Sequence, residues 1–255
     1  MVQKILITGA SSGIGQALAE YYAREGVFLA LTGRNEKRLQ AVSKTCIQKS
    51  ASVEFSCIDV QQPDKMKNWV GGLGLSQGFD LVIANAGISG GTGSDPQGEA
   101  LQQAHEIHDI NVKGVLNTVE VVLPAMLKNQ SGQIALMSSL ASFRGWPGAP
   151  AYSASKAFVR VYGEALRGSL KDQGIKVSVI CPGFIQTPMT TVNPYPMPFM
   201  ISAEKSAAII AKGLKGNKGR IAFPWPMYIM AGFIGLLPDF IAQFLLRFSP
   251  SKPKN

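Results

Sequence analysis

Seven short apolar runs, rich in Val, Ile and Leu, alternate with longer segments of helical periodicity along this chain. Strands that are hydrophobic throughout are typical of parallel sheets that helices cover on both faces. The chain has 255 residues, which is enough for one α/β domain with a large core. We therefore expect a single doubly wound α/β domain with strands at 2–8, 27–32, 52–58, 80–84, 132–138, 175–181 and 219–223.

Glycine and proline gather in three segments, 87–98, 145–150 and 182–198, and each of them follows an expected strand. Ligands of open parallel sheets bind outside the carboxyl ends of the strands. We therefore expect these three segments to form the rim of a binding site.

Two long helices are expected, over 97–128 and 150–172, and Pro124 should kink or end the first of them. His105 and His108 lie three positions apart on that helix and imitate a metal-binding pair. No third ligand is evident in the sequence. We interpret both histidines as surface or packing residues and expect no metal site.

The positive charge is concentrated near the C-terminus. The formal net charge is +9, and residues 212–255 hold seven Lys/Arg against one acid, Asp239. The rest of the chain is nearly balanced in charge. Because a basic patch without a recognition motif is weak evidence for nucleic-acid binding, we expect no nucleic-acid partner.

The cysteines Cys46, Cys57 and Cys181 are far apart, without the spacing of a zinc site or a disulfide framework. A reducing compartment, the cytoplasm, is the natural expectation. The first residues, MVQKILITGASSGIG, lead from a short apolar run into a glycine-rich turn. We interpret them as a strand and not as a secretion signal.

The segment TGASSGIG directly follows the first expected strand and opens a helix. Gly9, Gly13 and Gly15 permit a tight turn and bring backbone N–H groups close to a dinucleotide's pyrophosphate, although their spacing also fits an ordinary turn. The next strand ends in Gly33 and Arg34, where an NAD site usually has an acid. Because a guanidinium binds a 2′-phosphate bidentately, NADP is favoured and NAD is less expected.

Tyr152 and Lys156, in AYSASKAF, stand one helical turn apart and by themselves could be ordinary neighbours on a helix. Together with TGASSGIG, the segment YSASK makes the chain resemble the short-chain dehydrogenase/reductase family, in its branch of single-domain enzymes of this length. The resemblance runs from about residue 2 to about residue 223 and includes CIDV, ANAG, DINVKG, MSSLAS and CPGFIQTP in the family's order. One departure is Ala84, which stands where the family has an asparagine.

The resemblance implies a doubly wound Rossmann fold with a seven-stranded parallel sheet in the order 3-2-1-4-5-6-7. It also implies an NADP-binding catalytic domain over residues 1–223, with a substrate lid at about 184–215. The implied cofactor-binding residues are Gly9, Ser11, Ser12, Gly13, Ile14, Gly15, Arg34, Asp59, Val60, Asn85, Ala86, Gly87, Tyr152, Lys156, Pro182, Gly183, Ile185 and Thr187.

Four catalytic residues follow from the same resemblance. Tyr152 would be the acid/base, because a neighbouring ammonium favours its phenolate. Lys156 would supply that ammonium and hold the nicotinamide ribose, and Asn111 would hold a water that relays protons, unless it only bonds the backbone. Ser139, which lies thirteen residues before the tyrosine as in the family, would polarise the carbonyl, and Ser138 would be structural.

The substrate side is less specified by the sequence. Trp146 and Met189 are expected to contact the substrate together with Ser139 and Tyr152, in a segment rich in Pro, Met and aromatic residues. An apolar, adaptable lid favours a lipophilic carbonyl or alcohol, although these residues could simply pack on the domain.

Residues 224–255 form an apolar extension with basic flanks, outside the resemblance. Prolines and Asp239 divide the apolar run, so a membrane-spanning helix is not expected. The run 224–248 fits a peripheral contact with the inner face of a membrane. The alternative, a lid over the active site or an oligomer interface, is the more expected of the two.

The sequence therefore predicts an NADP-dependent oxidoreductase that interconverts a lipophilic ketone or aldehyde and its alcohol. The alternative is a non-catalytic NADP(H)-binding sensor with the same fold, which would have no use for the serine, tyrosine and lysine together. The resemblance further implies a homodimer or homotetramer built on the two long helices.

Overall fold

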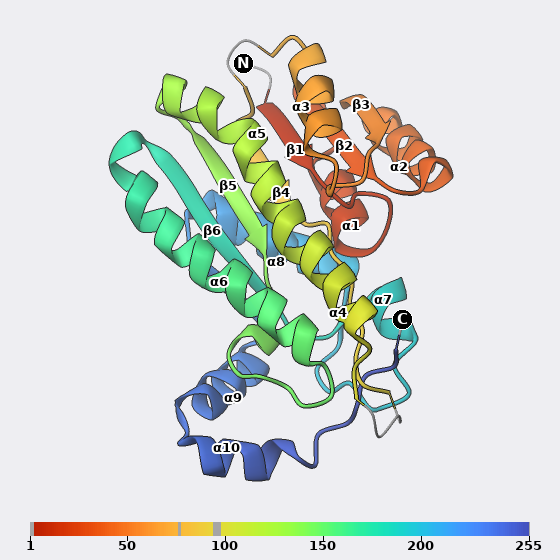
Figure 1. Ribbon diagram of the computed structural model, residues 1–255. Helices are drawn as coiled ribbons and strands as arrows, with labels where there is room; N and C mark the ends of the chain where they lie inside the picture. Colours follow the sequence, from red (N-terminus) through yellow and green to blue (C-terminus); the bar gives the residue numbers. More distant parts are fainter. Residues whose placement is uncertain (1–2, 76–77, 94–97, 255) are drawn as a thin grey trace.

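The computed structural model describes residues 3–75, 78–93 and 98–254. Its centre is a seven-stranded sheet in the order β3-β2-β1-β4-β5-β6-β9, with every pair parallel (Figure 1). This confirms the predicted fold and strand order, with β9 as the seventh strand. The strands are β1 Gln3–Ile7, β2 Val27–Gly33, β3 Ser52–Cys57, β4 Leu81–Ala84, β5 Gly132–Met137, β6 Ile175–Pro182 and β9 Arg220–Phe223.

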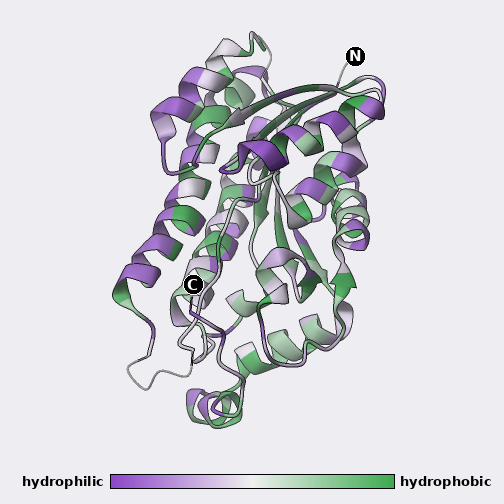
Figure 2. Ribbon diagram, turned by 90° about the vertical axis from the view of Figure 1, so that its right-hand side faces the viewer, coloured by the Kyte–Doolittle hydropathy of each residue, from purple (hydrophilic) through white to green (hydrophobic). Residues whose placement is uncertain are grey.

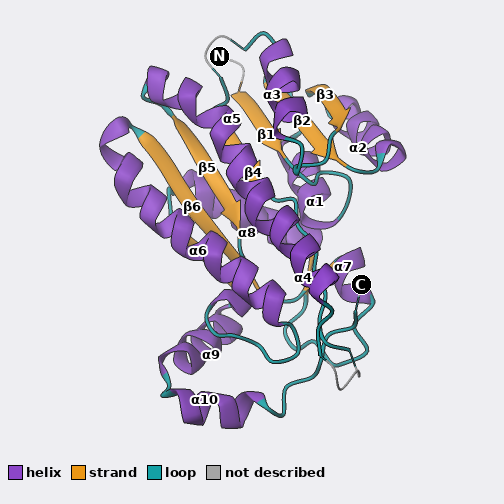
Figure 3. Cartoon of the chain, in the orientation of Figure 1, coloured by secondary structure: helices purple, strands orange, loops and turns teal. Residues whose placement is uncertain are grey.

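Helices cover both faces of the sheet (Figure 3). Successive side chains of a strand point to opposite faces. On β1, Ile5 and Ile7 pack with one group of helices and Leu6 with the other. The first group is α1 Gly13–Tyr22, α2 Glu36–Gln48 and α8 Ala203–Lys215; the second is α3 Pro63–Gly72, α5 Gly114–Asn129 and α6 Pro150–Leu170. Burial on both faces explains why the strands are hydrophobic throughout.

The first long helix continues past Pro124 to Asn129, so the expectation that Pro124 could end it is wrong. Both Pro124 and Glu120, whose carbonyl loses its helical partner, are exposed, so water can satisfy that carbonyl. The irregularity lies earlier, in a π-helical turn at Asp109–Lys113 that joins α4 Leu101–His108 to α5. The run Leu101–Asn129 is long and apolar enough to cross a membrane, but half of its most apolar window is buried and α5 packs on the sheet.

Short elements lie at the carboxyl edge of the sheet. The strand β7 Ile185–Gln186 pairs with β8 Ile201–Ser202, and α7 Pro188–Thr191 lies between them in the chain. This arrangement holds the segment after β6 over the edge where β1, β4, β5 and β6 end (Figure 1).

The C-terminal extension folds into α9 Trp225–Leu236 and α10 Asp239–Leu246. Tyr228 packs edge-on against Phe143, with ring centroids 5.6 Å apart, and the Arg144 guanidinium pairs with Asp239 at 2.6 Å. After α10 the chain returns to the carboxyl edge, where the C-terminus lies (Figure 1). The extension is therefore attached to the segment that follows β5.

The two C-terminal helices are rich in hydrophobic residues (Figure 2), and many of their apolar side chains are exposed, as is that of Phe248 just after α10. Those that are at least half exposed are Trp225, Ile229, Met230, Phe233, Leu236, Phe240, Phe244 and Phe248. We call this group the C-terminal apolar face. Single apolar side chains scattered over a surface are normal, whereas a group of this size on neighbouring helices indicates a contact surface.

Two glycines of α6 give a paired test of the packing. A Cβ added at Gly163 would lie 2.5 Å from Val179 Cγ2 on β6, whereas nothing lies within 4 Å of one at Gly168. We expect Gly163→Ala to lower the free energy of unfolding by about 1–3 kcal/mol through overpacking. We expect Gly168→Ala to raise it by up to about 1 kcal/mol, because alanine favours the helix. Chemical denaturation measures both, and equal effects would contradict close packing of α6 on β6.

Candidate active site

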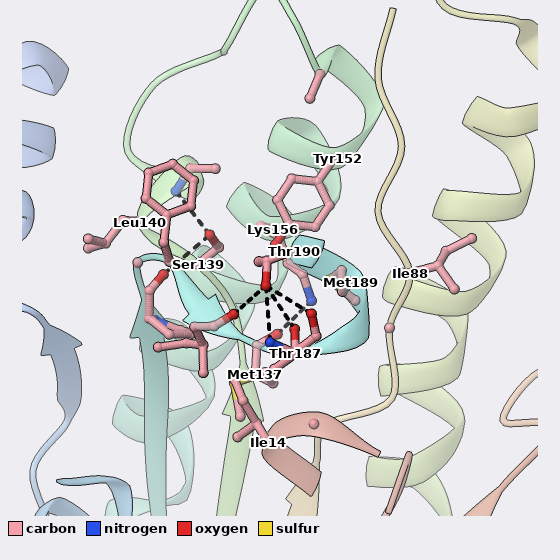
Figure 4. Close-up of a pocket in the computed structure, with 18 of the residues that line it drawn as sticks. Ile14, Ile88, Met137, Ser139, Leu140, Tyr152, Lys156, Thr187, Met189 and Thr190 are labelled. Atoms are coloured by element: carbon pink, nitrogen blue, oxygen red, sulfur yellow. Dashed lines mark hydrogen bonds between the residues drawn. The ribbon is translucent and has the colours of Figure 1, made fainter. Parts of the chain in front are cut away.

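A cavity of about 630 Å³ lies at the carboxyl edge of the sheet. Of the predicted site residues, all except Gly15 and Asn111 line it. Figure 4 shows Ser139, Tyr152 and Lys156 with the side chains around them, among them Thr187 and Thr190. The structure therefore brings together segments that lie far apart in the sequence.

The glycine-rich turn is packed so closely that its glycines are required. Gly9 has a φ of +66°, and a Cβ there would lie 2.8 Å from Ala86 Cα. A Cβ on Gly15 would collide with the Gly9 carbonyl oxygen and lie 2.5 Å from Asn85 Nδ2. Gly15 thus packs against the Gly9 carbonyl and the Asn85 side chain and does not line the cavity.

Thr8 and Asn85 join this turn to the segment after β4. The Thr8 hydroxyl accepts hydrogen bonds from the backbone N–H groups of Asn85 and Ala86, both at 3.1 Å. The Asn85 amide donates to the carbonyls of Thr8 and Gly9, at 3.0 and 3.2 Å. Sequence reasoning missed Thr8, whose position directly before the glycines was the available signal.

At the end of the cavity away from Tyr152 lie Arg34, predicted to bind the 2′-phosphate of NADP, and Asp59, a predicted cofactor-binding residue. Arg34 and Arg38 both line the cavity, and Arg34 is exposed. A Cβ on Gly33 would lie 3.1 Å from Ser11 Oγ, so the glycine lets the turn approach the end of β2. Asp59 is half-buried, and its carboxylate accepts from the Gln61 backbone N–H at 2.9 Å.

The two serines after β5 have different surroundings. Ser138 is buried and donates to the Lys156 carbonyl at 2.7 Å, and it also lines the cavity wall. Ser139 accepts from the Ala141 N–H at 3.1 Å and donates weakly to the Pro182 carbonyl at 3.5 Å. Because that second bond is long, the Ser139 hydroxyl is the better placed of the two to exchange partners.

Tyr152 and Lys156 lie on the first turns of α6. Burial raises the pKa of the Tyr152 phenol, and hydrogen bonding with Ser139 opposes this. Burial lowers the pKa of the Lys156 ammonium to about 8. The Lys156 Nζ donates to the Met137 carbonyl at 2.9 Å and lies 5.9 Å from the centre of the tyrosine ring. Burial is the larger of the two effects on the Tyr152 phenol, so its pKa lies above its ordinary value.

Asn111 is fully buried on the π-helical turn, behind Gly87. Its side chain accepts from the Ile88 N–H at 2.8 Å and donates to the Ile88 carbonyl and Ser155 Oγ, both at 3.0 Å. A Cβ on Gly87 would lie 3.1 Å from Asn111 Oδ1 and 3.2 Å from Lys156 Nζ. Asn111 thus ties the segment after β4 to α6, close to the lysine but outside the cavity.

The substrate end of the cavity is aromatic and apolar. Tyr195 lies between Trp146 and Phe184, with centroid distances of 6.3 and 6.4 Å. The Trp146 Nε1 is buried without a hydrogen-bond partner among the described residues. Other side chains of this wall come from α7 and the C-terminal helices: Met189, Met227, Met230, Ala231, Ile234 and Leu246.

Lys252 also lines the cavity, although no sequence motif includes it. Its side chain is buried, and its Nζ donates to Ser89 Oγ at 2.5 Å and lies 5.2 Å from the centre of the Tyr152 ring. Residues 249, 250 and 252 all line the cavity, so the C-terminal segment closes part of the site.

No group of three metal-ligating side chains occurs among the residues that the structure describes. His108 instead lies 3.4 Å from the Asp109 carboxylate on the surface.

Comparisons with known proteins show that this chain is similar to oxidoreductases. Residues 3–195 match the family model for short chain dehydrogenase. The chain is similar to an uncharacterized oxidoreductase of Myxococcus xanthus, with 36% identity over 92% of both chains. It is also similar to the serine 3-dehydrogenase of Agrobacterium fabrum, with 35% identity over 74% of both.

Two solved structures share the fold at 24% identity. One is a short-chain dehydrogenase of Sphingobium yanoikuyae in complex with NADPH, with a TM-score of 0.80 over 97% of this chain and 96% of that one. The other is a 3-oxoacyl-[acyl-carrier protein] reductase of Brucella melitensis with bound NAD, with a TM-score of 0.77 over 89% and 91%.

Proposed function

Since the chain belongs to the short-chain dehydrogenase/reductase family of oxidoreductases, we propose that it interconverts a lipophilic ketone or aldehyde and its alcohol with NADP as cofactor. The observation that carries the proposal is the convergence of Ser139, Tyr152 and Lys156 on one cavity with the glycine-rich turn. Residues 1–223 would form the catalytic domain, and residues 224–255 an extension of it.

The glycine-rich turn fits a dinucleotide. Gly9, Gly13 and Ser12 line the cavity at the N-terminus of α1, where backbone N–H groups favour a pyrophosphate. Tyr152 and Lys156 would hold the nicotinamide ribose, and Ile185 and Thr187 would meet the carboxamide. The nicotinamide, when bound, supplies or accepts the hydride.

Arg34 is the basis for choosing NADP over NAD. It stands directly after β2 with a second guanidinium, Arg38, on the same wall of the cavity. Two guanidinium groups suit a 2′-phosphate dianion, whereas an NAD site would place an acid at this position.

The protonated Tyr152 suits the direction of carbonyl reduction. Its phenol would donate a proton to the substrate oxygen, and its raised pKa keeps that proton available at neutral pH. Ser139 would donate a hydrogen bond to the same oxygen. Lys156 would return a proton to the tyrosine, and Asn111 would hold a water that connects the lysine to solvent.

The apolar wall formed by Trp146, Tyr195, Met189 and α9 supports a lipophilic substrate. The non-catalytic sensor is the weaker alternative, because it gives no role to Ser139 beside Tyr152. A cytoplasmic homodimer or homotetramer would use α5 and α6, where Leu127, Phe158 and Val161 are exposed.

The C-terminal apolar face would bind a lipid surface peripherally. Both α9 and α10 also contribute residues to the cavity wall. The same two helices would therefore contact the lipid surface and the substrate. Arg247 stacks on Phe244 and Phe248 at 4.7 and 4.5 Å and is exposed at the margin of the face, where anionic headgroups would meet it.

Replacement of the tyrosine tests the acid/base assignment. We expect Tyr152→Phe to lower kcat for ketone reduction by about 10²–10⁴-fold, because no proton donor replaces the phenol. NADPH binding, followed by nicotinamide fluorescence, should remain. Retained turnover would show that the proton comes from another group.

Replacement of the arginine tests the cofactor. We expect Arg34→Ala to weaken NADPH binding by about 10- to 100-fold and to leave NADH binding nearly unchanged, because only NADPH carries the 2′-phosphate. Lys37→Ala is the matched control, since Lys37 is exposed on α2 outside the cavity. Equal losses for both cofactors would remove Arg34 from cofactor choice.

Two phenylalanines of the C-terminal apolar face test lipid binding. Phe233 and Phe240 are exposed and do not line the cavity. We expect F233S/F240S to lose co-sedimentation with vesicles of phosphatidylcholine and anionic phosphatidylglycerol, with activity on a soluble ketone retained. If the variant instead changes only the oligomeric state in light scattering, the face is an interface between copies of the chain.

A further inference from the structure

Lys252 lines the cavity and comes from the C-terminal segment that follows α10. Its backbone is fixed between two of the rim segments. The Lys252 N–H donates to the Gly148 carbonyl at 3.2 Å, and its carbonyl accepts from the Gly93 N–H at 2.8 Å. The next residue accepts from the Gly91 N–H at 2.9 Å. The C-terminal segment is thus hydrogen-bonded along its backbone to both sides of the cavity mouth.

Glycines make this close approach feasible. A Cβ on Gly148 would lie 2.7 Å from the Pro250 carbonyl oxygen and from Ser251 Cα. A Cβ on Gly91 would lie 2.6 Å from both Lys252 Cβ and its carbonyl oxygen. A larger residue at either position would displace the segment. The backbone position of Lys252 is therefore defined by specific contacts with the two rim segments.

Among the described residues, no opposite charge is paired with the Lys252 ammonium, which lies at the cavity wall. It donates to the neutral hydroxyl of Ser89 and faces the ring of Tyr152. None of the ion pairs within the described part of the chain includes it. Burial lowers its pKa to about 8. Burying an ammonium is costly unless a negative charge is paired with it, and the described part of the chain supplies no such pair for Lys252.

The other cations of the cavity have different partners or positions. Arg144 is paired with Asp239, and Lys156 donates to the Met137 carbonyl beside the predicted ribose site. Arg34 and Arg38 lie with the residues predicted to meet adenosine. Among the described cationic side chains of the cavity, Lys252 therefore lies beside Tyr152 and has no role in binding the cofactor in the proposed function.

We propose that Lys252, whose ammonium is held by Ser89, binds a carboxylate of the substrate, so that the substrate is an oxo acid or hydroxy acid with an apolar remainder. This rests on the proposed function for the identity of the reacting carbonyl. One ammonium matches the single charge of a carboxylate, whereas a phosphate dianion requires more donors. The carboxylate lies at Lys252, the reacting oxygen at Tyr152, and the apolar part along Trp146 and the C-terminal helices.

Ligand binding tests this assignment independently of turnover. Calorimetric titration of the NADPH-loaded protein compares decanoate with decanamide, which has the same chain and no charge. We expect decanoate to bind about 10- to 100-fold more tightly, because hydrogen bonds to charged groups are the stronger ones. Equal affinities for the two ligands would overturn the proposal.

Variants of the C-terminal segment assign the preference to one side chain. We expect K252M to abolish the preference for decanoate and K252R to retain part of it, which a merely structural role would not produce. K254M is the matched control, because Lys254 is exposed and lies two residues along the same segment. A K252M variant that weakens both ligands equally would show that Lys252 only closes the cavity.

Turnover supplies a second readout. With 3-oxodecanoate and its methyl ester as substrates, K252M should raise KM for the acid about 10-fold or more and leave kcat and the ester unaffected. If the wild-type protein reduces neither compound but still prefers decanoate over decanamide, the proposed reaction fails and the carboxylate site stands. If it reduces both equally well, the carboxylate site fails and the reaction stands.

Discussion

The rest of the site depends on the junction between β1 and β4, where the strand order of the sheet reverses direction. The chain leaves β1 toward one face and β4 toward the other, which opens a crevice at the carboxyl edge. Thr8 holds this junction, because its N–H donates to the Ile83 carbonyl and its hydroxyl accepts from two N–H groups after β4. The glycine-rich turn and the segment that faces Lys156 are thereby fixed relative to each other.

From this junction the cavity extends in two directions of different chemistry. Arg34 and Arg38 mark one end, beyond the glycine-rich turn. Tyr152 and Lys252 lie toward the other, where the walls become aromatic and methionine-rich. A ligand set of a phosphorylated dinucleotide and an acidic, apolar substrate would match both ends in charge and leave the reacting centre between them.

Much of this could be predicted from local pattern. The strands were recognisable because each is buried on both faces, and the glycine-rich turn because positions 9 and 15 have no room for a Cβ. The path after Phe223 could not be predicted, since it depends on contacts such as Phe143 with Tyr228 that lie far apart in the sequence. The continuation of α5 past Pro124 could not be predicted for a related reason, because the sequence does not show that Glu120 is exposed and that water can satisfy its unpaired carbonyl.

The burial of Lys252 is unexpected, since lysine is rarely buried without an ion pair and none of the ion pairs in the described part of the chain includes it. A pKa lowered from 10.5 to about 8 corresponds to on the order of 3 kcal/mol against the charged form in the folded state. That cost is present below pH 8 and disappears as pH rises toward 10.5, where the unfolded lysine also loses its proton. Met, which would fill the same space without this cost, is common elsewhere on this wall. An ammonium retained at such a position is explained by a ligand whose negative charge offsets its burial.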